Sequence, residues 1–200
     1  MLNSSSAFAF IGGRLVLDFV NELGRSSGFS WDDLLDFLLA AKITTAERSA
    51  QLLSLPDADP HSAGGLLMKA RRLHAAFRSG FAALLRSEPV PRAAIEAIND
   101  ILRITEGHDE LVSDGSQWRI EFVARENSLD WLLAAIARSG AEILVEAPSA
   151  PLRVCSNPAC GLFFYDTSRT HRRRWCSMAR CGNRHKVAAF SRRHAAGRGA

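Results

Sequence analysis

The sequence lacks the long apolar segments and the leader that would place it in or across a membrane. No apolar run reaches the roughly 18 residues that a membrane-spanning helix needs, and the best candidates, 34–41 and 131–137, are short and flanked by charge. The amino terminus has no basic leader, and Arg14 interrupts its apolar stretch, so we expect no secretory signal. These absences predict a cytoplasmic protein that has no membrane partner.

Several motifs that indicate common enzyme classes are also missing. The chain contains no H-E-x-x-H, no P-loop, and no H-x-E paired with the P-C-x-x-C of zinc deaminases. We therefore expect a binding protein and not an enzyme.

Cysteine is scarce, and its placement is informative. The four cysteines all lie in the last 46 residues with the spacing C-x4-C-x15-C-x4-C. A reducing cytosol disfavours disulfides, and two short cysteine pairs can grip the two sides of a tetrahedral ion. Four thiolates also complete the shell, which argues against zinc catalysis because catalytic zinc keeps a position for water. The spacing predicts one structural Zn²⁺ ligated by Cys155, Cys160, Cys176 and Cys181.

Acidic residues are nearly absent from the last quarter of the chain. Residues 151–200 hold 11 Arg or Lys against the single acid Asp166, a net charge of +10, whereas residues 1–150 carry −6. A small basic module beside an acidic body is the composition expected when the basic part meets a polyanion.

Arginine accounts for most of that positive charge, and guanidinium groups bind phosphate oxygens through two hydrogen bonds at once. Two other interpretations stay open. The arginines could form an ordinary solvated surface, or they could dock onto the acidic body of the same chain. The predicted nucleic-acid contacts are Arg169, Arg172, Arg173, Arg174, Arg180, Asn183, Arg184, Lys186, Arg192 and Arg193.

The first 150 residues predict a mainly helical α+β domain with one β-hairpin. Helical patterns cover 31–41, 44–55, 61–87, 91–106 and 128–146, whereas 56–60 forms a loop and the state of 15–20 is open. Alternating residues around Asp114-Gly115 predict strands at 110–113 and 117–124. The expected inward positions include Ile95, Ile98, Leu102, Trp131, Leu132, Ala135, Ile136 and 143–145.

The prolines at 148 and 151 mark a linker, so we predict domains at 1–150 and 151–200. In the second domain, a turn at Asn157-Pro158 and a following strand suit a zinc ribbon-like module of turns, strand and short helix. Phe163, Phe164, Tyr165 and Trp175 would form its small core, although Tyr165 could also stack on a base. In the helix after Cys181, Val187 and Phe190 would pack inward.

The segment from Leu152 to Lys186 resembles the CGNR zinc-finger family, whose name matches Cys181-Gly182-Asn183-Arg184. The opening Gly12-Gly13-Arg14-Leu-Val-Leu-Asp-Phe-Val-Asn21 resembles the start of the ABATE domain that usually precedes this finger. The resemblance implies a zinc ribbon-like finger on a helical body, with the four cysteines as zinc ligands. It also implies a stress-induced transcription regulator or an RNA-binding protein.

The favoured hypothesis is a zinc-dependent nucleic-acid-binding regulator, acting on DNA or RNA, whose body supplies a homodimer contact or senses a small-molecule effector. A second hypothesis makes the finger a protein-interaction or intramolecular docking unit. A third places a small-molecule site in the body, with Asp18, Asn21, His74 or His108 in a pocket.

Overall fold

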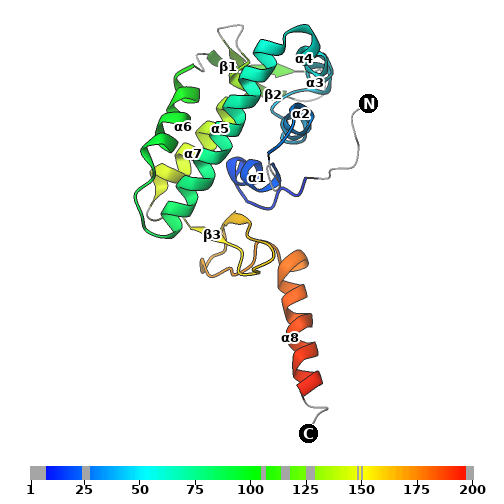
Figure 1. Cartoon of the computed structure of the whole chain (residues 1–200), viewed down its shortest axis with the longest axis vertical. Coiled ribbons are helices and arrows are strands. Elements are labelled where there is room, and N and C mark those ends of the chain that lie inside the picture. The colour runs from blue at the N-terminus through cyan, green and yellow to red at the C-terminus, as the bar shows by residue number, and fades with distance from the viewer. Residues whose placement is uncertain are drawn as a thin grey trace.

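The computed structural model describes residues 8–23, 28–104, 107–113, 118–124, 129–147, 149 and 151–196, with side chains excepted at 104, 107–110, 112–113, 118–119, 121–124, 189 and 192–196. Seven helices form a body, a hairpin lies at one end of it, and a small module hangs from the other end (Figure 1). This is the mainly helical α+β arrangement that the sequence predicts. Within the described residues, no helix is both long enough and apolar enough to cross a membrane.

The body helices follow one another with short connections. They are α1 (Leu15–Glu22), α2 (Trp31–Ala40), α3 (Ala46–Leu53), α4 (Leu55–Ala58), α5 (Pro60–Leu85), α6 (Arg92–Ile104) and α7 (Trp131–Glu146). A capping box starts α2, because the Ser30 hydroxyl accepts from the Asp33 amide while the Asp33 carboxylate accepts from the Ser30 amide. Helix α3, predicted from residue 44, starts at Ala46 with Thr45 as its cap.

The central core is formed where α1, α2, α5 and α7 meet. Phe19, Phe37, Phe77 and Phe81 are fully buried there, and the Phe77 and Phe81 rings stack with centroids 5.5 Å apart. At Gly140 of α7 an added Cβ would lie only 2.0 Å from Phe77 Cε1, so this glycine lets the helix approach the ring closely. Large side chains on four helices therefore fill one interior.

Several predictions within the body were wrong in detail. Part of the predicted 56–60 loop belongs to α4, and segment 15–20, whose state the sequence left open, is helical. In α6 Ile98 is buried as predicted, but Ile95 and Leu102 are 43% and 36% exposed. The buried stripe of α6 lies one residue earlier, and α7 leaves Ala135 exposed and Val145 83% exposed. The residues that replace the wrong α6 positions in the core are Ala94, Ala97 and Ile101.

The hairpin pairs β1 (Gly107–Ser113) with β2 (Trp118–Ala124) in antiparallel register. Gly107, predicted as a helix stop, opens the first strand. Leu111 pairs with Ile120, and these two side chains are 66% and 70% exposed. The predicted turn at 114–115 and the predicted helix caps at 127–128 lie outside the described residues.

The small module contains a second antiparallel pair, β3 (Leu152–Val154) with β4 (Phe163–Tyr165). A π-helical turn η1 (Met178–Gly182) then leads into α8 (Asn183–Ala196). Two apolar side chains of the module, Leu152 of β3 and Phe163 of β4, join the core of the body. The centroid of the Phe163 ring lies 5.9 Å from that of Phe81. The module is thus packed against the body through its strands.

Candidate metal centre and nucleic-acid interface

The four cysteine sulfurs converge in the small module, and all lie within 4.8 Å of one another. Cys176 Sγ is 3.7 Å from Cys160 Sγ and 3.8 Å from Cys181 Sγ. A tetrahedral zinc site with Zn–S bonds of about 2.3 Å has S···S edges of about 3.8 Å, whereas a disulfide requires about 2.0 Å. The spacing of the sulfurs fits a zinc-binding finger, and the predicted ligands are together.

The environment of the thiols also favours a cation. Cys155, Cys176 and Cys181 are buried, and burial raises the pKa of the Cys176 thiol far above its ordinary value. Such a site holds thiolates only when a positive charge compensates for the lost hydration. A metal ion among the four sulfurs would supply that charge and hold the ligand loops together.

Backbone turns place the ligands as the sequence predicts. The Cys160 amide donates to Asn157 O at 2.9 Å, and the Cys155 amide donates to Leu162 O at 2.9 Å. The Asn157 side-chain amide lies 3.6 Å from Cys181 Sγ, within reach of a hydrogen bond that would favour the thiolate. The Asn-Pro turn therefore supports a ligand from each cysteine pair.

Asp166, the single acid of the module, organises its central loop. Its side chain is fully buried and accepts from the Arg173 amide at 2.8 Å and from the Ser168 hydroxyl at 2.6 Å. Arg153 Nε lies 3.4 Å from the same carboxylate. Asp166 is thus used inside the module, so it compensates little of the charge on the outer surface.

Asn21 of α1 grips the backbone of β4. Its side-chain amide donates to Phe163 O at 2.7 Å, and its side-chain oxygen accepts from the Phe163 amide at 3.0 Å. Both residues are buried, with Asn21 only 3% exposed. The Asn21 side chain therefore provides hydrogen-bond partners for both the backbone amide and the backbone carbonyl of Phe163.

The glycine-rich opening segment holds the next part of β4. The Tyr165 amide donates to Gly12 O at 2.7 Å, and Gly13 adopts the left-handed φ of 79° that favours glycine. The Arg14 guanidinium lies 4.5 Å above the Tyr165 ring and 3.1 Å from Glu146, which also accepts from the Tyr165 hydroxyl. Tyr165 therefore forms a contact between module and body.

The opening segment also reaches the cysteine cluster. Ile11 packs against the apolar cluster that contains three of the cysteines, Leu162 and Phe164. Residues 11–21 thus touch both the metal centre and β4, a role that sequence reasoning missed. The resemblance of 12–21 to the start of a known domain was the available signal, but it did not indicate what this segment binds.

Most predicted nucleic-acid contacts are surface residues of the module. Their side chains are exposed, and none of them forms an ion pair with any described residue. Arg173 differs, because it is half-buried, lies 4.9 Å above the Phe164 ring and donates to Cys176 O. The side chains of Arg192 and Arg193 lie outside the described residues. The exposed set, which we call the arginine face, is Arg169, Arg172, Arg174, Arg180, Asn183, Arg184 and Lys186.

Among the residues that the structure describes, the contact between module and body is made without the arginine face. It is made by β3 and β4 through apolar packing, by Asn21, and by the Arg14–Tyr165–Glu146 group. The sequence-based alternative of arginines docked onto the acidic body is therefore not the arrangement found among the described residues.

The polar residues considered for a small-molecule site have other partners. The Gly12 amide donates to Asp18 Oδ1 at 2.7 Å, and His74 Nε2 lies 3.2 Å from Val20 O. Burial raises the pKa of Asp18 to about 6 and lowers the pKa of His74. The side chain of His108 lies outside the described residues. Asp18 and His74 thus hold the α1 region together.

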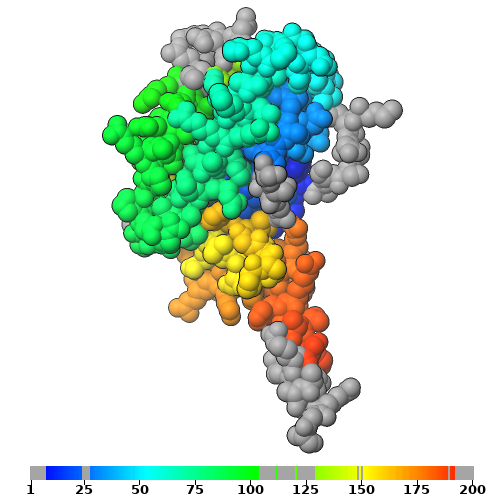
Figure 2. Space-filling view, viewed as in Figure 1, coloured from blue at the N-terminus to red at the C-terminus, as the bar shows by residue number. Residues whose placement is uncertain are grey.

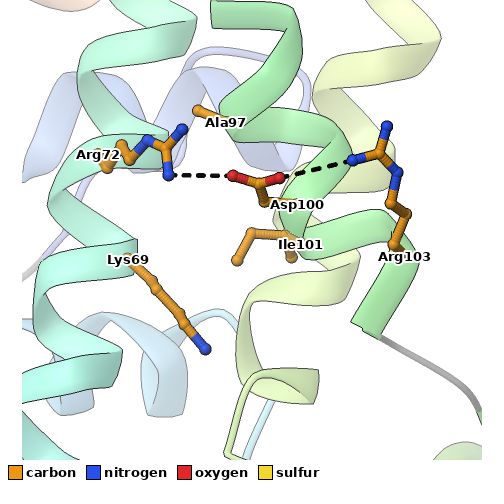
Figure 3. Close-up of a pocket in the computed structure, with 6 residues that line it drawn as sticks. All are labelled: Lys69, Arg72, Ala97, Asp100, Ile101 and Arg103. Atoms are coloured by element: carbon orange, nitrogen blue, oxygen red, sulfur yellow. Dashed lines mark ion pairs between the residues drawn. The ribbon is translucent and has the colours of Figure 1, made fainter. Parts of the chain in front are cut away.

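A pocket of about 270 Å³ lies elsewhere, between α5 and α6 (Figure 3). Asp100 stands between two guanidinium groups, 3.0 Å from Arg72 and 3.6 Å from Arg103. Lys69 Nζ is 2.6 Å from Asp130. The three cations that line the pocket thus each form an ion pair with an acid. Its lining consists of Lys69, Arg72, Ala97, Asp100, Ile101 and Arg103.

The fold and the cysteine geometry define a helical protein with a four-cysteine zinc finger. Two family models match the chain in this order: the ABATE domain, described as "Putative stress-induced transcription regulator", over residues 13–147, and the CGNR zinc finger over residues 152–194. The chain therefore belongs to the ABATE family and carries a CGNR zinc finger. A search of curated proteins found no match.

Proposed function

We infer that this protein is a zinc-dependent nucleic-acid-binding protein that regulates transcription. The observation that supports this most is the arginine face, which is exposed, unpaired with described acids and built around the cysteine cluster. After Asp166 the chain has no acidic residue. Phosphate oxygens are the ligands that such a surface binds best.

In this proposal one Zn²⁺, held by Cys155, Cys160, Cys176 and Cys181, has a structural role. The ion fixes the loops that carry the arginines, while Asn21 and Arg14 fix the finger on the body. We propose binding without catalysis, because four thiolates leave no open zinc position for water or substrate. Thiolate ligands need a reducing compartment, so we propose the cytoplasm as the location. Dimerisation and an effector stay predictions.

A salt titration tests the proposal. Zinc-loaded protein is titrated with duplex DNA, single-stranded DNA and RNA at several salt concentrations. We expect affinity to fall steeply with salt, since each phosphate contact contributes about 0.9 to the log–log slope on duplex DNA. Flat or absent binding to all three would contradict the proposal, and equal binding after zinc chelation would show that zinc does not organise the surface.

A charge reversal locates the binding surface. Arg172→Glu should weaken binding about tenfold and reduce the salt slope by about one contact. Arg78→Glu is the matched control, because Arg78 is exposed on α5 of the body and the change in net charge is identical. Equal losses in the two variants would show a nonspecific effect of net charge.

A further inference from the structure

Helix α8 stands apart from the rest of the molecule. It starts two residues after Cys181 and runs away from both finger and body, as Figure 1 shows; its orange-red atoms project below the finger in Figure 2. Its 14 residues correspond to about 21 Å of helix. The Trp175 ring, 4.7 Å from that of His185, contacts its first turn.

The helix presents a distinct outward face. At about 100° per residue, Asn183, Val187 and Phe190 project opposite His185, while Arg184 and Lys186 flank them on the two sides. Val187 is 65% exposed and Phe190 55% exposed, so the prediction that they pack inward was wrong. A narrow apolar strip bordered by cations therefore faces solvent.

Charge selects the kind of partner that fits this face. The segment 183–196 contains Arg184, Lys186, Arg192 and Arg193 and no acid. A second copy of the same helix would bring like charges together, and an apolar strip of two residues is narrow for a membrane surface. A polyanion with a groove matches both the cations and the strip.

We propose that α8 inserts into the major groove of duplex DNA, an inference that rests on the proposed function. The B-form major groove, about 12 Å wide, admits a helix, and apolar side chains there contact thymine methyl groups. The deep, narrow major groove of A-form RNA does not admit side chains in this way. Arg184 and Asn183 then reach base edges beside the finger, since arginine pairs with guanine and asparagine with adenine.

A helix-breaking variant separates insertion from simple attraction of charges. Ala188→Pro interrupts α8 seven residues beyond the last cysteine and changes neither net charge nor ligands. Ala188→Gln, at the same exposed position, keeps a good helix former and is the control. Zinc content and circular dichroism of both full-length variants confirm that the finger and body remain folded.

The expected result is a loss of about tenfold or more in affinity for duplex DNA with Ala188→Pro, since one base contact is worth about 1–3 kcal/mol. Binding to single-stranded DNA should change little, and Ala188→Gln should match the unsubstituted chain. Methylation protection should show guanine N7 shielded in the major groove, with the shielding lost in Ala188→Pro. These three results together support insertion.

Other outcomes overturn the inference in distinguishable ways. If no nucleic acid binds the unsubstituted protein, both the proposed function and the role of α8 fail. If Arg172→Glu weakens binding but Ala188→Pro does not, the finger binds phosphates and α8 inserts nowhere. Tighter binding to duplex RNA, or to vesicles of anionic lipid, than to duplex DNA would likewise overturn insertion.

Discussion

Replacing Asn21 by alanine should loosen the finger from the body while leaving the zinc ligands intact. The substitution removes two hydrogen bonds, of 2.7 and 3.0 Å, and leaves the buried amide and carbonyl of Phe163 without these partners. An orphaned buried polar group costs about 1–3 kcal/mol. Two such groups give about 2–6 kcal/mol, and partial access of water to the cavity favours the lower half of that range.

Urea unfolding of the zinc-loaded full chain measures this effect. With an m value of about 2 kcal/mol/M, a loss of about 3 kcal/mol lowers the midpoint by about 1.5 M. Zinc content without denaturant should stay unchanged, because no cysteine is touched. Asn99→Ala is the control, since Asn99 is half-buried on α6 and distant in sequence from the finger contact.

The outcome that refutes this reasoning is a loss below about 1 kcal/mol, or one no larger than that of Asn99→Ala. Either would show that water replaces the Asn21 amide at β4 at little cost. The Arg14–Tyr165–Glu146 group and the apolar packing of Phe163 would then hold the finger without it.

Three further predictions concern the core, the pH dependence and the metal. Gly140→Ala should lower thermal stability by about 2–3 kcal/mol because its Cβ would lie 2.0 Å from Phe77, whereas Gly64→Ala, with nothing within 4 Å, should be neutral or stabilising. The pKa of Asp18 is about 6 in the folded protein and near 3.8 in the unfolded chain, so the folded state favours the protonated carboxyl. The stability that this contributes is fully present below pH 3.8 and is lost as pH rises through 6. Relative to Asp18→Asn, the unsubstituted protein should therefore lose roughly 1 kcal/mol of unfolding free energy between about pH 5 and 7, as measured by urea unfolding. The same dependence of unfolding free energy on pH in both proteins would contradict this. Cys176→Ser should abolish stoichiometric zinc binding. It should also speed amide hydrogen exchange in β4 and in the end of α1 that contacts β4. Unchanged exchange in α1 would mean that metal binding and the docking of the finger on the body are independent.

Local patterns predicted the helices and the cysteine site well, because both depend on neighbours in the sequence. The start of α2 follows from a local capping box, and the paired spacing of the cysteines predicted the four sulfurs that the structure brings together. In α6 the predicted buried positions 95, 98 and 102 and the observed buried positions 94, 97, 98 and 101 both have helical spacing. Only packing against α5 and α7 selects the second, and there small alanines allow close approach of the helices.

The docking of the finger was not predictable in this way. Asn21 contacts a strand 142 residues later, and a single asparagine carries no signal of such a partner. The same limit explains α8. Val187 and Phe190 have the spacing of a packed helix face, yet both are largely exposed, because the body lies on the other side of the finger from α8 (Figure 1).

The acidic residues of the body and the basic residues of the finger interact with different partners. Acids of the body pair with cations of the body, as Asp100 does with Arg72 and Asp130 with Lys69, and Glu146 helps to hold the finger. Among the described residues, no acid forms an ion pair with the arginine face, although the same chain carries −6 within residues 1–150. A polyanion approaching the molecule would be repelled by the body and attracted by the finger, within a Debye length of about 8 Å at physiological salt. Because Asn21 and Arg14 hold the finger on the body, this field favours binding of a polyanion at the finger and not at the body.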